Sequence, residues 1–146
     1  MTLVPLIDAE HITMRFGGVT AVRNVNFTLQ ESELRCLIGP NGAGKSTFFK
    51  ILTGQLHPTE GKVAFRGTDT TRAEPHEIAR LGVGIKTQVP NVFDGLTVFE
   101  NVLVAAQRKQ TGPTARRTVS EVLERLRLTA IANRIVGQLA HGQRQW

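Results

Sequence analysis

The chain has 146 residues, 40% of them hydrophobic, and its formal net charge is +6 at pH 7. This length fits one globular domain or part of a larger one, and the hydrophobic share excludes a chain that is disordered throughout. A single cysteine excludes disulfide bonds within the chain, and no apolar run reaches the roughly 18 residues that span a bilayer.

The first part of the chain predicts an antiparallel β unit. Residues 6–16 and 25–29 alternate apolar and polar side chains, and the turn-forming pair Gly17-Gly18 lies between them. The next run, LRCLIG at 34–39, is short, apolar and ends on glycine, which is typical of a buried strand in a parallel sheet. We therefore expect Cys36 to be a buried structural thiol.

Shorter elements follow this run. Residues 45–54 predict a helix that a glycine closes, and a Pro/Gly turn introduces a strand within 57–67. A short helix over 74–82 is expected to begin near its proline, and 83–88 is another strand candidate. This order of strands and helices indicates an α/β protein.

In the last third of the chain the apolar period becomes helical. Thr97 and Glu100 form a T-x-x-E capping box at the start of one helix, which we expect the pair Gly112-Pro113 to close.

A second helix in this region is predicted over 115–128, with one apolar face. Glu121 and Arg125 are spaced as an i,i+4 ion pair on another face of this helix. The sequence shows no internal repeat and no low-complexity tract, so this helical segment completes the predicted layout.

The strongest chemical signal is GPNGAGKST at 39–47, which satisfies G-x-x-x-x-G-K-[ST], follows an apolar run and opens a predicted helix. Glycines let the backbone N–H groups turn inward as a nest for phosphate, and the helix N-terminus adds partial positive charge. Lys45 can reach the β- and γ-phosphates, and the Ser46 hydroxyl can ligate Mg²⁺. This predicted phosphate-binding loop, or P-loop, consists of Gly39, Pro40, Asn41, Gly42, Ala43, Gly44, Lys45, Ser46 and Thr47.

The P-loop and its neighbouring motifs resemble, in order, the ATP-binding subunits of ABC transporters. MRFGGVTAVRNVNFTL resembles the family's opening segment, and GIKTQVPNVFDGLTVFENVLVA resembles its Q-loop and the helix after it. The resemblance implies that Phe16 stacks on adenine, and that Gln88 senses Mg²⁺ and the γ-phosphate and links the site to membrane subunits. From the residues alone, the alternatives are that Phe16 is part of the core and that Gln88 is an ordinary polar surface residue.

The segment LAHGQ resembles the family signature, which in this family closes over the nucleotide held by a second subunit in a head-to-tail pair. Ala140 stands where the family has serine, so a hydroxyl contact with the γ-phosphate is missing, whereas His141 keeps a polar donor nearby. The signature residues are Leu139, Ala140, His141, Gly142 and Gln143.

The fold implied by this resemblance is the α/β fold of a P-loop NTPase of the ABC ATPase type, incomplete at the C-terminus. We expect a nucleotide-binding core at 1–88, a helical subdomain at 89–140, and the signature with the start of its helix at 139–146.

Hydrolysis also needs an acidic residue for Mg²⁺ and a base or polarising group for the attacking water. In the family an Asp-Glu pair soon after the signature supplies both, and this sequence contains three aspartates and no Asp-Glu pair. We therefore expect no catalytic residue in this chain, and a marginally stable or aggregation-prone product when the chain is made alone.

The resemblance implies an ATP-binding subunit of an importer for branched-chain amino acids, urea or related amides, with ATP and Mg²⁺ as cofactors. It would lie on the cytoplasmic face of the membrane, paired with a second ATP-binding subunit and with transmembrane permease subunits, which the loop around 89–96 would contact. The alternative is a free-standing nucleotide-binding or interaction protein without transport ATPase activity. Only the net charge of the chain suggests action on nucleic acid, and we expect no nucleic-acid partner.

Overall fold

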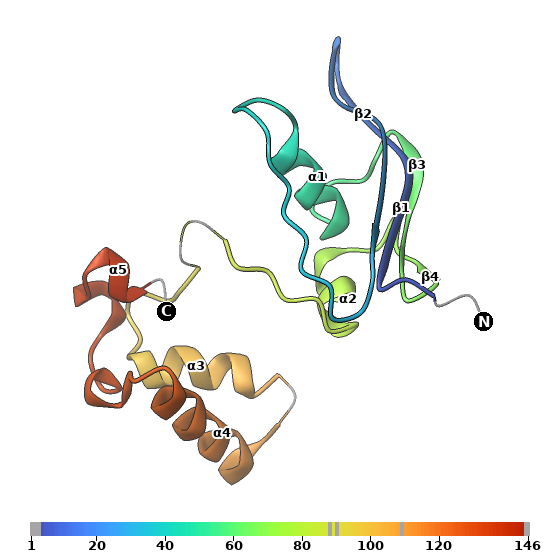
Figure 1. Cartoon of the computed structure of the whole chain (residues 1–146). Helices are drawn as coiled ribbons and strands as arrows, with labels where there is room; N and C mark the ends of the chain where they lie inside the picture. The colour runs from blue at the N-terminus through green and yellow to red at the C-terminus, as the bar shows by residue number, and fades with distance from the viewer. Residues whose placement is uncertain (1–3, 88, 90, 109, 145–146) are drawn as a thin grey trace. The chain divides into compact units, whose positions relative to one another are not determined.

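A computed structural model of the chain describes residues 4–87, 89, 91–108 and 110–144, which belong to two compact units (Figure 1). Unit 1 is Met1–Ile85 and unit 2 is Lys86–Trp146. Each unit encloses a hydrophobic core of its own. In the part of the chain that the structure describes, no helix is long and apolar enough to cross a bilayer.

Unit 1 is built on a four-stranded antiparallel sheet with the strand order β2-β1-β3-β4 (Figure 1). Gly17-Gly18 joins β1 and β2 as a two-residue turn, which confirms the predicted antiparallel unit. The second strand begins six residues earlier than predicted, because 19–24 pair with the end of β1 across several irregularities in register. The strands are β1 (Ile7–Phe16), β2 (Val19–Leu29), β3 (Glu60–Phe65) and β4 (Thr68–Asp69).

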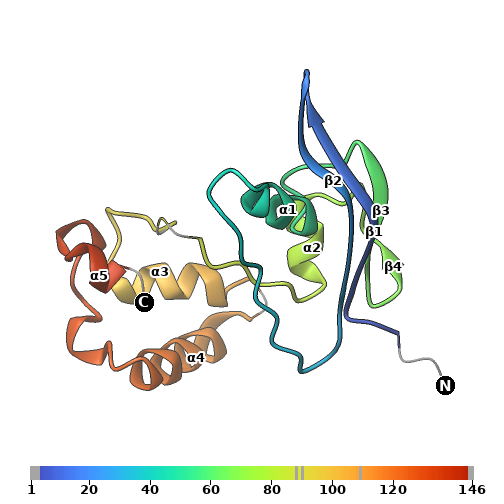
Figure 2. The same cartoon turned by 45° about the horizontal axis from the view of Figure 1, so that its top comes forward.

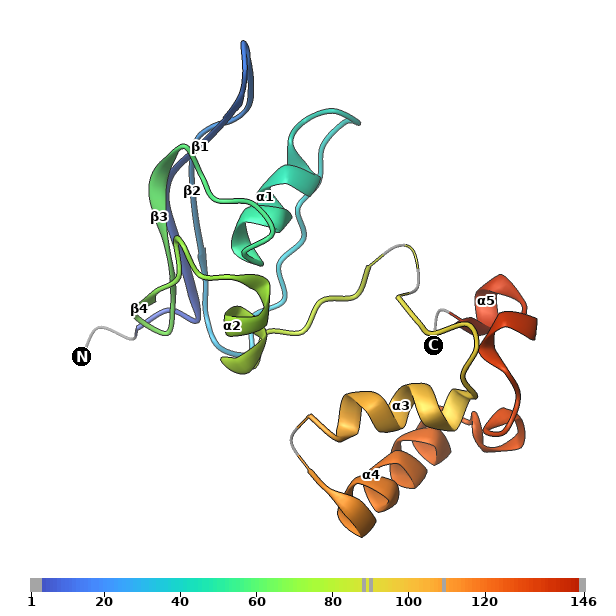
Figure 3. The same ribbon diagram turned by 180° about the vertical axis from the view of Figure 1, so that it is seen from behind.

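Two helices cover one face of this sheet, α1 (Lys45–Leu52) and α2 (Pro75–Arg80), as the front and back views both show (Figures 1 and 3). Gly54 follows the C-cap of α1 with φ of 72°, in the left-handed region that glycine tolerates, as predicted. α2 begins at Pro75, also as predicted. Phe48 and Ile51 of α1 complete a core with sheet residues Ala9, Ile12, Met14, Val22 and Val63.

The prediction of a buried parallel strand at 34–39 is wrong. Residues 34–38 form an extended stretch between β2 and α1 without strand pairing (Figure 2), and among the described residues no backbone hydrogen bond joins them to another segment. A parallel strand is stable only between neighbours that accept its hydrogen bonds, and here Leu34, Ile38 and Cys36 are exposed. The buried thiol is therefore also wrong, and 83–87 is likewise not a strand.

Unit 2 is helical, and α3 and α4 pack side by side within it (Figure 3). Its core consists of Val98, Val119, Leu123, Val136 and Leu139. Backbone hydrogen bonds from Val98 N to Arg134 O (3.0 Å) and from Val136 N to Leu96 O (2.9 Å) join the start of α3 to the segment that leads into η2. The elements are α3 (Val98–Ala106), α4 (Gly112–Arg125), the 3₁₀ turns η1 (Thr129–Ile131) and η2 (Val136–Gln138), and α5 (His141–Arg144).

The capping box at the start of α3 is confirmed. The Thr97 hydroxyl accepts from Glu100 N at 3.2 Å, and the Glu100 carboxylate accepts from Thr97 N at 2.7 Å. The predicted end of this helix is wrong, because α3 stops at Ala106 and Gly112-Pro113 instead opens α4. Proline suits the first helical turn, where its missing N–H leaves no bond unmade.

The ion pair predicted on the last long helix also differs. Glu121 accepts from Arg117 Nε at 3.0 Å, four residues before it, rather than pairing with Arg125. Both side chains of the observed pair are exposed, so its contribution to stability is about 0.3–0.5 kcal/mol.

Candidate phosphate-binding site

The P-loop of unit 1 turns through left-handed backbone at two glycines. Gly42 has φ of 83° and Gly44 has φ of 84°, a region where residues with a side chain are strained. Between them Ala43 N donates to Pro40 O at 3.3 Å. The sequence GPNGAG thus takes the sharply turned path that a phosphate-binding nest requires.

Gly44 is also fixed by what lies behind it. A Cβ at this position would stand 2.2 Å from the carbonyl oxygen of Ala21 and 3.3 Å from Cγ2 of Val22. The loop therefore lies directly against the backbone of β2, which leaves no room for a side chain. Sequence reasoning missed Ala21, because no pattern in the chain indicates which backbone carbonyl this glycine approaches.

The Lys45 side chain links the two ends of the P-loop by hydrogen bonds. Its Nζ donates to Gly39 O and to Pro40 O, each at 2.6 Å, so the side chain folds back from the first residue of α1 to the start of the loop. An ammonium group has three N–H donors, and these two bonds leave one for a ligand oxygen. Lys45, which the motif predicts to bind phosphate, therefore also stabilises the conformation of the loop.

The first turn of α1 adds further donors. Gly44 is its N-cap and supplies no side-chain cap, and no acidic residue lies in the first turn. The first N–H groups of a helix have no intrahelical partner, and the helix dipole makes this end electropositive. The exposed Ser46 lies here, so its hydroxyl is available beside the loop as a ligand for a hard cation.

Two further residues were predicted for the site, Phe16 in unit 1 and Gln88 in the range of unit 2. Phe16 ends β1 opposite Val19 and is 47% exposed, so the alternative that it is an ordinary core residue is wrong. Gln88 lies outside the described residues.

The signature residues lie in unit 2 and form one turn. Leu139 is buried in that unit's core, and α5 begins at His141. Gln143 closes the turn, because its Oε1 accepts from Ala140 N at 3.3 Å and its own N donates to Ala140 O at 2.9 Å. Gly142 is exposed, and a Cβ added at this position would meet nothing within 4 Å.

Arg144 supports this turn and was missed in the sequence. It donates to Gly137 O at 2.8 Å and its NH1 lies 3.5 Å from the carboxylate of Asp94. The Asp94 carbonyl also accepts from Gly137 N at 2.9 Å. Asp94, in the segment before α3, therefore contacts both η2, through Gly137, and the last residue of α5, Arg144.

Three carboxyl groups have lowered pKa values, and hydrogen bonds from turns and caps explain them. The pKa of Glu33 is lowered by the backbone N–H of Gln30 and then by Arg35, and that of Glu100 by the N–H and hydroxyl of Thr97. The pKa of Asp69 is lowered by the hydroxyl and the N–H of Thr71. The hydrogen bonds behind these shifts are local, and none of the three carboxyl groups lies in the P-loop or in the signature turn.

The sequence comparisons agree on one family. Residues 22–146 match the family model described as ABC transporter. The chain is 41% identical to the high-affinity branched-chain amino acid transport ATP-binding protein LivG of Escherichia coli K12 and 38% identical to BraF of Pseudomonas aeruginosa, in both cases over 97% of this chain and 62% of the relative. It is also 34% identical to the nucleoside import ATP-binding protein NupA of Lactococcus lactis, over 99% of this chain and 29% of the relative.

Solved structures give the same result for the fold. The ADP conformation of an ATP-binding cassette of an ABC transporter matches with a TM-score of 0.80 and 30% identity, over 96% of this chain and 61% of that one. A dimeric cassette bound to ADP and Pi matches with a TM-score of 0.81 and 29% identity, over 94% of this chain and 65% of that one. The predicted α/β fold of the ABC ATPase type is confirmed, and the chain spans less than two thirds of the length of these relatives.

Proposed function

Since the chain belongs to the ABC transporter family, we propose that its P-loop binds the phosphates of ATP. The observation that supports this most directly is the closed loop itself, with two left-handed glycines and Lys45 folded back onto Gly39 and Pro40. The two left-handed glycines give the backbone the sharp turns of an anion nest, and Lys45 supplies a cation at the same loop.

Within this proposal each residue of the site has a separate task. Lys45 donates its third N–H to a phosphate oxygen while its other two bonds hold the loop in shape. The Ser46 hydroxyl ligates Mg²⁺, and Gln88 is proposed as a second ligand from the following segment. The metal, when bound, neutralises phosphate charge.

Phe16 is proposed as the platform for the adenine base. It stands half-exposed at the end of the β1–β2 hairpin, and the same hairpin contributes Ala21, which lies against Gly44 of the loop. An exposed aromatic ring offers an apolar face on which a purine can stack.

At the level of the whole transporter, we place this chain in an importer for branched-chain amino acids, urea or related amides. The names of LivG and BraF support the first of these solutes, whereas that of NupA shows that similar chains serve nucleoside import. The partners would be permease subunits, contacted through 89–96, and a second ATP-binding subunit whose nucleotide the signature turn covers. The position would be peripheral, on the cytoplasmic face of the membrane.

For the 146-residue chain by itself, we expect ATP binding without turnover. The sequence has no Asp-Glu pair to hold Mg²⁺ and activate water, and a general base alone contributes about 100- to 10,000-fold to a rate. The alternative is a free-standing nucleotide-binding protein with no transport role. Co-purification with membrane permease subunits would favour the importer, and a stable chain that binds ATP with no membrane partner would favour the alternative.

Titration of ATP against Lys45→Ala tests the central proposal. We expect affinity to fall roughly 10- to 100-fold, because the variant loses both a charged hydrogen bond to phosphate and the bonds that close the loop. Lys50→Ala is the matched control, since Lys50 is an exposed lysine in the last turn of the same helix. Equal affinities of the parent and Lys45→Ala would overturn the proposal.

A further inference from the structure

The P-loop contains the one Asn-Gly pair of the sequence, Asn41-Gly42, whereas the other asparagines precede valine, phenylalanine or arginine. Asparagine is a thermolabile residue, because the backbone nitrogen of the next residue can attack its side-chain amide. The attack is fastest before glycine, since no Cβ stands beside the attacking nitrogen. Asn41 is therefore the asparagine at which this reaction meets the least steric hindrance.

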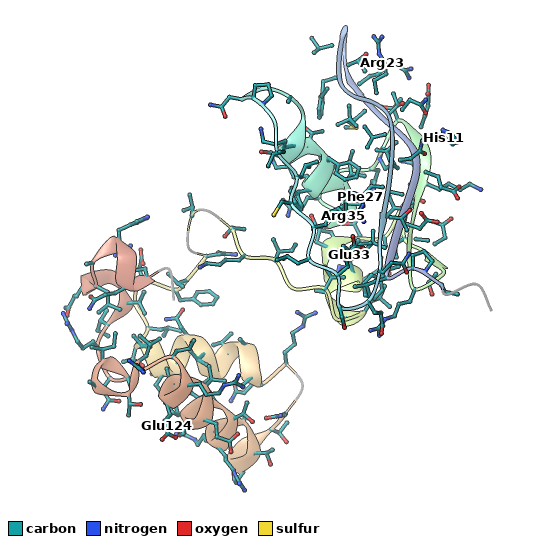
Figure 4. All side chains as sticks on the ribbon, in the orientation of Figure 1. His11, Arg23, Phe27, Glu33, Arg35 and Glu124 are labelled. Carbon is teal, nitrogen blue, oxygen red and sulfur yellow. The ribbon has the colours of Figure 1, made fainter. Side chains whose placement is uncertain are left out.

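The pair occupies the two central positions of a tight turn within the P-loop. Ala43 N donates to Pro40 O at 3.3 Å, and the φ of Gly42, 83°, is close to the value of about +80° at the third position of a type II turn. A Cβ added at Gly42 would meet nothing within 4 Å. In Figure 4 the loop that contains this turn extends beyond the N-terminal end of α1. The turn hydrogen bond thus spans the pair without using either reacting group.

Neither reacting group is held in another bond. Among the described residues, Gly42 N donates to no carbonyl oxygen and the Asn41 side-chain amide has no hydrogen-bond partner. A group that is already hydrogen-bonded must lose that bond before it reacts. Asn101 shows the contrast, because its Nδ2 donates to the carbonyl oxygens of Phe93 and Thr97, each at 3.0 Å. The Asn101 side chain is restrained by these contacts, and that of Asn41 is not.

We propose that Asn41 is a site of spontaneous deamidation, which places a carboxylate in the phosphate-binding loop. The Gly42 nitrogen loses its proton to water and bonds to Cγ of Asn41. The bond between Cγ and Nδ2 breaks as that nitrogen takes a proton and leaves as ammonia, so a succinimide ring forms. Water then opens the ring at either of its carbonyl groups. The products are aspartate, and isoaspartate, in which the main chain runs through the former side chain.

Both products weaken the binding of phosphate, a consequence that rests on the proposed function. Each product carries a negative charge beside the site of an anionic ligand, and like charges at close range repel each other. Isoaspartate also lengthens the main chain by a methylene group, which alters the turn on which the anion nest depends. Deamidation therefore lowers the ATP affinity of the chain as it ages.

Incubation of the whole chain at mildly alkaline pH, followed by peptide mapping with mass spectrometry, tests the site. Asn133 is the matched internal control, because it is also exposed, lies in a turn and has no side-chain hydrogen bond within the described ranges, but precedes arginine. We expect Asn41 to convert to aspartate and isoaspartate roughly tenfold faster than Asn133. Asn41→Gln should remove the fast phase of ammonia release, since glutamine closes such a ring far more slowly. Equal rates at Asn41 and Asn133 would overturn the proposal.

Titration of ATP tests the consequence separately. Asn41→Asp carries the charge of the product from the start, and we expect it to bind ATP roughly tenfold more weakly than Asn41→Gln, which is uncharged at this position. Asn133→Asp adds the same charge in unit 2 and should bind ATP as the parent does. Equal affinities of Asn41→Asp and Asn41→Gln would contradict the effect of the charge. If the parent bound no ATP, the proposed function would fail, whereas the measured deamidation rates would still decide the site.

Discussion

Unit 1 and unit 2 differ in how far along the chain their hydrogen bonds reach. In unit 2 the helices close bonds over four residues, and the Thr97–Glu100 box caps α3 from within its own first turn. In unit 1 the sheet joins residues far apart in sequence, such as Ile7 and Phe65. A helix satisfies its own backbone, whereas a strand exists only where another segment accepts its bonds.

The consequence is visible in two apolar runs. The segment at 98–106 is a helix as its pattern predicts, but 34–38 is apolar and extended without becoming a strand. Apolar composition alone therefore predicts secondary structure less well in unit 1 than in unit 2. Three pairs of substitutions test whether the two units behave as separately stabilised parts.

The largest effect is expected from emptying either core. Ile12 in unit 1 and Leu123 in unit 2 are both buried, so Ile12→Ala and Leu123→Ala should each cost about 2–5 kcal/mol of stability in their own unit. Hydrogen exchange measured by segment should show faster exchange in β1 for the first variant and in α4 for the second. If either variant reduced protection equally in both units, the two units would unfold together, and the prediction of separate stability would be wrong.

A smaller effect is expected at the P-loop glycine that approaches β2. Gly44→Ala should cost about 1–3 kcal/mol, because it combines φ of 84° with a Cβ 2.2 Å from Ala21 O, and it should weaken ATP binding. Gly142→Ala in unit 2 is the comparison, since that position is open and helical, and its stability should be unchanged or slightly raised. Thermal unfolding of the two variants measures this difference in stability. An equal loss of stability in Gly44→Ala and Gly142→Ala would contradict the prediction.

The smallest effect concerns the caps of the two long helices. Thr97→Ala should lower the stability of unit 2 by about 1 kcal/mol, because its hydroxyl accepts from Glu100 N. Thr111 is the N-cap of α4 but makes no side-chain cap bond, so Thr111→Ala should change stability far less. Denaturant unfolding of the two variants gives the difference, and a larger loss in Thr111→Ala would be the contrary result.

The sequence by itself determined the features that depend on a few neighbouring residues. The P-loop pattern located the turn of GPNGAGKST, the T-x-x-E pattern located the start of α3, and two glycines located the β1–β2 turn. In each case the residues that form the structure lie within a few positions of one another, so the local sequence is sufficient to predict it.

Only the tertiary structure decided the features that need a distant partner. It showed that 34–38 stays unpaired and leaves Cys36 exposed, that Ala21 O sets the glycine requirement at position 44, and that Arg144 braces the signature turn against Asp94. No local pattern contains these contacts, because each joins segments whose meeting depends on how the rest of the chain packs.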